Sequence, residues 1–191
     1  NEGNDGNGSN VGHVRIYQNV DGAWSQIGAD IDGEAAGDNS GNSLSLSADG
    51  SIVAIGATGN DGNGENSGHV RIYQNVNGTW IKIGDDIDGE ATGDNSGTSV
   101  SLSDDGSVVA IGTTGNGENS GHVRIYQNVN GTWIKIGDDI DGEAAGDNSG
   151  TSVSLSADGS IVAIGASLNE GNDGNGNNVG HVRIYQNVDG A

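Results

Sequence analysis

The sequence predicts an all-β fold, built as a repeat array of four-stranded antiparallel sheets. The first observation is that GHVRIYQNV recurs nearly unchanged, opening at Gly12, Gly68, Gly121 and Gly180. Copies about 55 residues apart indicate one supersecondary unit used repeatedly. The second observation is the alternation of polar and apolar residues between Asp-Gly and Asn-Gly turns, which is typical of β-hairpins. The third is that no stretch has a convincing helical period.

The segment from 42 to 97 illustrates one unit. SLSLS alternates as a strand with one buried face does, and IVAIGA is short and apolar, as in a strand buried on both faces. HVRIYQNV alternates again, and the Asn77-Gly78 turn leads into TWIKI. We therefore expect strands at 43–47, 52–57, 69–76 and 79–83. The Gly- and Asn-rich segment 58–68 and the acidic segment 85–97 are expected to be loops.

The same pattern divides the chain into one partial unit and three others. The predicted boundaries are 1–41 (third and fourth strands and a linker), 42–97, 98–150, and 151–191, which lacks a fourth strand. Four hairpin-connected strands at this spacing describe a β-propeller blade, whereas the coils of a β-helix are much shorter. Asn1–Ala23 recurs as Asn169–Ala191 with one difference, so we infer a segment of a longer chain in which three-unit blocks recur.

The order DNSG-x-SVSLS-x-DG-x-x-VAIGA, then a Gly/Asn/Asp loop and GHVRIY, resembles the FG-GAP repeat of integrin-α-type β-propellers and their bacterial and algal relatives. Ser96-Gly97 stands where that family has Phe-Gly, and Gly56-Ala57 where it has Gly-Ala-Pro. The chain contains no Phe and no Pro. Its turn between the first two strands is shorter than the family's Asp-rich calcium loop. The resemblance implies a propeller fold.

The composition limits the kinds of partner that we expect the chain to bind. The formal net charge is −21, with only 6 Lys and Arg residues, so we expect no nucleic acid partner, because phosphate binding needs clustered cations. Divalent cations or high salt are the natural source of counter-ions for such a chain. Without Cys there is no disulfide frame. No apolar run approaches the roughly 18 residues of a membrane span, so membrane insertion is not expected.

Two acidic loops in each unit are predicted calcium sites. They follow the second and fourth strands and should emerge on the same face of the array. Oxygen ligands at alternate positions among glycines suit calcium. The alternatives are a solvated linker for the first loop and Asx-capped turns for the second. The candidate ligands are Asp61, Asn63, Glu65, Asp86, Asp88, Glu90, Asp94, Asp139, Asp141, Glu143, Asp147, Asp173 and Asn175.

The His, Arg and Trp residues of each unit are better explained by architecture than by chemistry. We expect the histidines to pack or form hydrogen bonds, and the arginines to pair with a neighbouring blade's carboxylate or to stack on Tyr or Trp. The tryptophans at 24, 80 and 133 either staple one blade to the next or, if exposed, offer platforms to sugars. Asn7, Asn77 and Asn130 begin possible glycosylation sequons, although a hairpin needs Asn-Gly in any case.

The sequence gives no reason to expect an enzyme, because near-identical repeats lack the asymmetric arrangement of side chains that catalysis needs. We expect a secreted structural or adhesive protein, extracellular or at the cell surface, which assembles with copies of itself or with adjoining repeats. The alternative is a lectin-like propeller that binds glycans. Because an unpaired strand edge is a template for another strand, we expect the missing strand beside His181–Val188 to come from outside the segment. In a longer parent chain it would be the AWSQIGADI segment of the following three-unit block, and between separate chains it would be Ala23–Ile31 of a neighbour, giving a closed ring or a filament.

Overall fold

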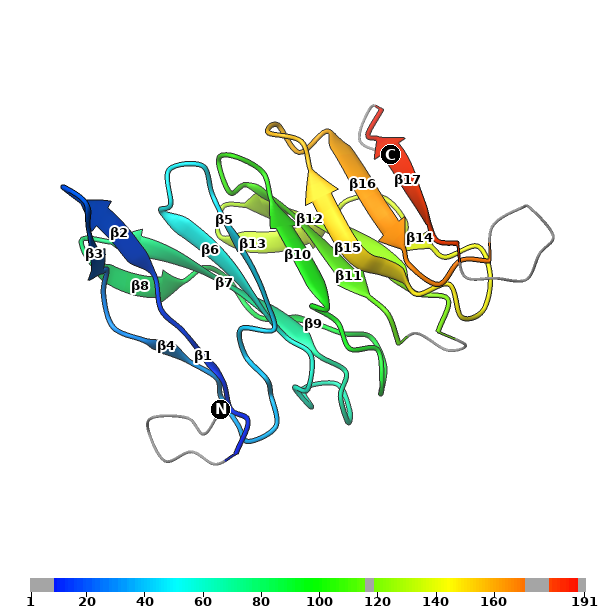
Figure 1. Cartoon of the computed structure of the whole chain (residues 1–191), viewed down its shortest axis with the longest axis horizontal. Coiled ribbons are helices and arrows are strands. Elements are labelled where there is room, and N and C mark those ends of the chain that lie inside the picture. The colour runs from blue at the N-terminus through cyan, green and yellow to red at the C-terminus, as the bar shows by residue number, and fades with distance from the viewer. Residues whose placement is uncertain (1–8, 116–118, 171–178, 189–191) are drawn as a thin grey trace.

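The computed structural model describes residues 9–115, 119–170 and 179–188, which form an all-β array (Figure 1). Its sheets follow one another along the molecule, and each full sheet is a β-propeller blade. Within the described residues there is no helix, as the sequence predicted. None of these residues therefore forms a helix long and apolar enough to cross a membrane.

The strands occur in the predicted order within each blade, and neighbouring strands are antiparallel. The first full blade is β5 (Ser43–Leu46), β6 (Ile52–Ala57), β7 (His69–Val76) and β8 (Thr79–Lys82). The second is β10 (Ser99–Leu102), β11 (Val108–Thr113), β12 (His122–Val129) and β13 (Thr132–Lys135). The last sheet holds β15 (Ser149–Leu155), β16 (Ile161–Ala166) and β17 (His181–Gln186). The N-terminal partial blade holds β1 (His13–Val14), β2 (Tyr17–Val20), β3 (Ala23–Gln26) and β4 (Ile31–Asp32).

A short fifth strand corrects one prediction. The segment 85–97 is not a loop throughout, because β9 (Ile87–Asp88) pairs with the start of β7, with Val70 opposite Ile87. Beyond β8 the ladder continues with a hydrogen bond from Ile83 N to Ile72 O (2.7 Å). Gly84 then adopts a left-handed φ of 71°, and the chain returns to β7 after a bulge. β4 and β14 (Ile140–Asp141) repeat this arrangement.

The two kinds of hairpin turn differ in structure. Asn77 and Gly78 have φ of 52° and 86°, as a type I′ turn requires. The Asp-Gly turns are longer: Ser47 N donates to Ile52 O (2.9 Å), and of the residues between them only Gly50 is left-handed. An Asp carboxylate organises each of these turns. In the last one, hydrogen bonds from Ser156 and Ser160 lower the pKa of Asp158 to about 2.

The apolar core lies between blades rather than within them. In one buried cluster, Val70 and Ile72 of the first full blade pack with Val100, Leu102 and Ile111 of the second. The clusters on either side repeat this arrangement. The inner strands of successive blades are joined directly, since Leu102 N donates to the Ser45 hydroxyl (2.9 Å). Each blade is thus stabilised by its neighbours, as in other repeat proteins.

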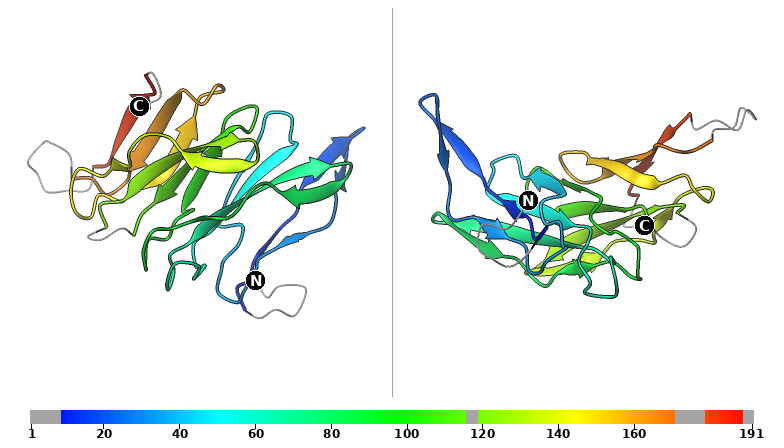
Figure 2. Two further views of the ribbon diagram at one scale, coloured as in Figure 1. Left: turned by 180° about the vertical axis from the view of Figure 1, so that it is seen from behind. Right: turned by 60° about the horizontal axis from the view of Figure 1, so that its bottom comes forward.

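The array has the two faces that strand alternation predicted. The loop after β6 (58–68) and the segment after β8 lie side by side, with Gly93 N donating to Glu65 O and Ser96 N to Ser67 O (both 2.9 Å). The Asp-Gly turns lie at the opposite end of the strands (Figure 1). Viewed from below, the array is an open arc whose two ends, β2–β3 and β17, turn toward the same side (Figure 2).

Candidate functional site at the blade junctions

The most regular polar feature is an arginine that crosses each blade junction. Arg71 donates from Nη2 to the carbonyl of Asp32 (2.8 Å), and its Nη1 lies 3.3 Å from Glu34 Oε1 in the preceding blade. Arg124 pairs in the same way with Glu90 (3.2 Å). Arg183 donates to the carbonyl of Asp141 (2.6 Å) and lies farther, 3.8 Å, from Glu143. The predicted pairing with a neighbouring blade's carboxylate is confirmed.

These arginines are held in an enclosed setting. Arg71 and Arg124 are buried, and the Arg71 guanidinium stands 5.7 Å from the centre of the Tyr73 ring. Such a cation–π contact, together with the carbonyl and carboxylate partners, offsets part of the cost of removing the charge from water. The repeated Arg, Glu and Tyr are therefore structural parts of the junction.

Tryptophan closes the outer part of two of the three junctions. Trp80 is half-buried and donates its indole N–H to the carbonyl of Ile27 (2.9 Å), and Trp133 donates in the same way to Ile83 (3.0 Å). Both rings pack against the apolar cluster of their junction. Trp24 differs, because 70% of it is exposed. The staple interpretation is thus confirmed for Trp80 and Trp133, and Trp24 lies on open surface.

His69 lies below the acidic segment, fully buried. Its Nδ1 is 3.8 Å from Asp86 Oδ2 and 4.0 Å from Asp88 Oδ1. Burial lowers the pKa of His69, and the nearby Arg71 charge lowers it further. Burial also raises the pKa of Asp88. Ligand atoms of Glu34, His69 and Asp86 lie within 4.8 Å of one another, but both carboxylates already have a cationic partner, Arg71 for Glu34 and Lys82 for Asp86.

The structure brings some predicted calcium ligands together and separates others. Asn63, Asp86 and Asp88 line one cleft. Glu90 instead reaches across the junction to Arg124, and Asp94 turns inward to accept the N–H groups of Glu90 and Ala91 (2.9 and 2.8 Å). The role of Asp94 matches the Asx-cap alternative.

The equivalent residues of the next blade follow the same division. Asp139 accepts from Lys135 (2.6 Å), as Asp86 does from Lys82 (2.5 Å). Asp141 lines a cleft with Asp139, and Glu143 faces Arg183. Asp147 accepts from the Asn169 amide (2.8 Å). The carboxylates that line these clefts outnumber the lysines that pair with them.

The first acidic loop is held by hydrogen bonds within itself and to the second acidic segment. Asp61 Oδ1 accepts from Asn66 N (2.8 Å), the Asn63 amide donates to Gly89 O (2.9 Å), and the Glu65 side chain is exposed. Asp173, Asn175 and Asn7 lie outside the described residues. Asn77 and Asn130 occupy exposed type I′ turns.

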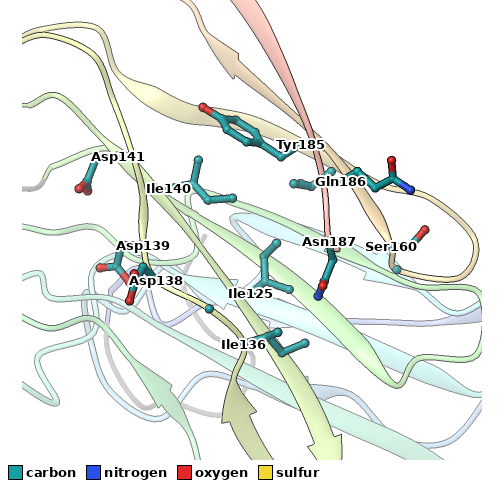
Figure 3. Close-up of a pocket in the computed structure, with 13 residues that line it drawn as sticks. Ile125, Ile136, Asp138, Asp139, Ile140, Asp141, Ser160, Tyr185, Gln186 and Asn187 are labelled. Carbon is teal, nitrogen blue, oxygen red and sulfur yellow. The ribbon is translucent and has the colours of Figure 1, made fainter. Parts of the chain in front are cut away.

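A cleft lies beside the acidic segment at each of the three junctions. The cleft of about 500 Å³ next to β9 is lined by Asp85, Asp86 and Asp88 on one side and by Tyr126 and Trp133 on the other. The preceding junction has an equivalent cleft of about 320 Å³ beside Tyr73 and Trp80. At the third junction a cavity of about 400 Å³ is lined by Ile125, Ile136, Ile140 and Tyr185, with no Trp among its lining residues (Figure 3).

Sequence reasoning missed the close contact between the two Asn-Ser-Gly segments of each blade. Asn66 and Asn95 have left-handed φ of 52° and 55°, and Gly68 forms a parallel bridge with Ser96. A side chain on Gly68 would collide with the backbone of Ser96. The signal in the sequence is the double occurrence of Asn-Ser-Gly within each of the two full blades, at 66–68 with 95–97 and at 119–121 with 148–150.

Comparison with known proteins supports the fold alone. No protein-family model matches the chain, and no curated protein is similar to it in sequence. The chain is similar in structure to a Bacteroides uniformis protein assigned provisionally as a 6-phosphogluconolactonase (TM-score 0.59, 15% identity, covering 93% of this chain and 45% of that one). It is also similar to a Lactobacillus plantarum protein (TM-score 0.53, 15% identity, 91% and 45% covered). The chain thus spans just under half the length of each.

Proposed function

We propose that this protein is a secreted or cell-surface repeat protein with a structural or adhesive role, related to the FG-GAP propellers. The observation that supports the proposal is the recurrence of the junction contacts: an Arg–Glu pair crosses all three junctions, and a Trp–carbonyl hydrogen bond joins two of them. Contacts that recur with every repeat suit an array, in which each unit meets the next in the same way. Because the junctions share one chemistry, we propose no enzymatic activity.

Self-assembly of the purified chain tests this function. We expect sedimentation velocity to show species larger than the monomer that grow between 1 and 100 μM, roughly the range in which moderate interfaces form. Electron microscopy of the same samples distinguishes closed particles from filaments. A single monomeric species at every concentration would contradict the proposal.

Calcium is the proposed ion of the acidic face. Asn63, Asp86 and Asp88 would hold it at the cleft, where it would offset charge repulsion within the acidic segment. A ligand that binds only the folded state raises the apparent stability, so we expect the thermal midpoint to fall when EGTA is added. Asp88→Asn should lose that shift, whereas Asp49→Asn, at a turn on the opposite face, should keep it. An unchanged midpoint in the unaltered chain would remove calcium from the proposal.

Glycan binding is the second candidate. The observation that favours it is the cleft in which Asp85 and Asp86 face the rings of Tyr126 and Trp133. Sugar hydroxyls donate hydrogen bonds to carboxylates, and the apolar face of a sugar ring stacks on an aromatic side chain. Binding on a glycan array that disappears with Asp85→Asn, an exposed residue, would support this function, since that change spares the junction contacts.

A further inference from the structure

His69 is a buried polar side chain that the fold leaves without a hydrogen bond. Only 1% of it is exposed, and its Nε2 has no hydrogen-bond partner among the described residues. Its Nδ1 lies 3.8 Å from Asp86 Oδ2 and 4.0 Å from Asp88 Oδ1, which is too far for a hydrogen bond. Because a buried polar group without a partner costs stability, packing alone does not explain a histidine at this place.

The carboxylates around His69 each meet their cation through a single oxygen. Lys82 contacts Oδ1 of Asp86, so that the second oxygen, Oδ2, is the one nearest to the imidazole. Arg71 contacts Glu34 through Oε1. Asp88 has no Lys or Arg partner among the described residues. The ion pairs therefore leave carboxylate oxygens available beside the histidine.

The backbone sets the histidine beside these acids in every repeat. His69 at the start of β7 is directly opposite Asp88 of β9, and residues opposite each other in an antiparallel pair have their Cβ atoms about 4.5–5.5 Å apart. Glu34 reaches the same place from the preceding blade, and ligand atoms of Glu34, His69 and Asp86 lie within 4.8 Å of one another. The register recurs with His122 opposite Asp141 and His13 opposite Asp32.

The next junction repeats the whole arrangement. His122 is also buried, and its Nε2 has no hydrogen-bond partner among the described residues. Lys135 contacts one oxygen of Asp139, and Arg124 contacts one oxygen of Glu90 from the preceding blade. In the described part of the chain only the first set has all its ligand atoms within 4.8 Å of one another, so we expect the first set to bind more tightly.

The mixture of nitrogen and oxygen atoms selects the class of ion. Calcium takes oxygen ligands, whereas imidazole suits zinc and the neighbouring transition metals. Burial lowers the pKa of His69, so the ring is neutral at pH 7, which is the form that binds a metal. Neighbouring ligand atoms in a tetrahedral zinc site are about 3.4 Å apart, so the separations around Nδ1 need to shrink by only roughly half an ångström.

We propose that the junction binds a divalent transition metal ion of the zinc class. Its ligands are Glu34 of one blade and His69, Asp86 and Asp88 of the next. The ion joins two blades, and Arg71 and Lys82 hold the outer oxygens of its carboxylate ligands. The inference goes beyond the proposed function and does not depend on self-assembly. Because Asp86 and Asp88 are shared with the proposed calcium ion, the two metals compete for this place.

Metal titrations of the stripped chain test the proposal. The protein is treated with EDTA, dialysed, and titrated by calorimetry with zinc chloride and, separately, with calcium chloride. We expect zinc to bind at least about tenfold more tightly than calcium, because a nitrogen ligand favours zinc. His69→Gln with His122→Gln should weaken zinc binding by about tenfold or more and leave calcium binding unchanged. Asp49→Asn, at a turn on the opposite face, is the control and should leave zinc binding unchanged.

A second measurement uses the unaltered chain and therefore needs no variant to fold. Zinc addition should shift the imidazole nitrogen resonances of His69 in NMR spectra. Zinc binding no tighter than calcium binding, zinc affinity that survives loss of both histidines in a folded variant, or unmoved His69 resonances would overturn the proposal. Calcium binding without zinc binding would overturn this inference alone. Zinc binding without calcium binding would instead remove the calcium ion from the proposed function.

Discussion

Identical strands lie in opposite environments at the middle and at the end of this array. Val70 and Ile72 on β7 are buried, whereas Val182 and Ile184, at the same places in the same sequence, are mostly exposed. The strand is not what differs, because both copies read HVRIYQ. What differs is the following blade, which covers β7 with β10 and β11 and is absent beside β17 in the described residues. Burial here is a property of the junction rather than of the blade.

The largest expected effect comes from opening a closed junction. Trp133→Ala should lower the free energy of unfolding by about 3 kcal/mol, because it removes a packed ring and leaves the carbonyl of Ile83 without its donor. Trp80→Ala should cost a similar amount. Urea denaturation followed by circular dichroism measures both.

Trp24→Ala is the control for that experiment. Measured at low protein concentration, it should change the unfolding free energy by less than about 0.5 kcal/mol, since surface changes away from packed features cost little. If Trp24→Ala and Trp133→Ala lowered the unfolding free energy equally, the stabilising effect of Trp133 would not come from its place in the junction.

A smaller effect is expected from the ion pair that crosses the junction. Glu90→Gln leaves the buried Arg124 with a weaker partner, and we expect a loss of about 1–2 kcal/mol. Asp30→Asn breaks the more exposed pair with Arg15 and should cost less than Glu90→Gln, because solvent screens an exposed ion pair. The same urea titrations compare the two variants, and a greater loss at Asp30 would contradict the difference between enclosed and open pairs.

The smallest effect concerns pH. Burial lowers the pKa of His69 and of His122, so below about pH 6.5 the unfolded chain binds protons that the folded chain does not. Stability should therefore fall as pH drops through that value and level off below the folded pKa values. His69→Gln should reduce the slope, and adding His122→Gln should reduce it further. A urea midpoint that rises between pH 7.5 and 5.5 would contradict this origin.

Alternation and turn residues were sufficient to predict the long strands. Each of them depends on contacts within its own hairpin, which the local sequence encodes. Strand β9 was not predicted, because its two residues, Ile87 and Asp88, are too few to show an alternation. Its pairing partner, the start of β7, is also distant in the sequence. The only local signal was an isoleucine inside an otherwise acidic segment.

The candidate site was harder to predict for a related reason. In the sequence, Glu90 and Asp94 cannot be told apart in role, because both are acidic residues at a spacing that suits metal ligands. Their different partners, Arg124 in the next blade and the backbone of their own loop, are set by how blades stack. The arginine pairing could be predicted because buried Arg needs a carboxylate, but the identity of that carboxylate required the structure.

The repeated unit varies in length at one place only, the loop between its second and third strands, at 58–68, 114–121 and 167–180. The hairpin turns and the Trp, Arg and Glu of the closed junctions keep the same spacing. Because the entropy of closing a loop rises slowly with its length, residues can be inserted there at little thermodynamic cost. A gene encoding such units can therefore lengthen by duplication and diversify one surface, while every new copy still fits onto the last.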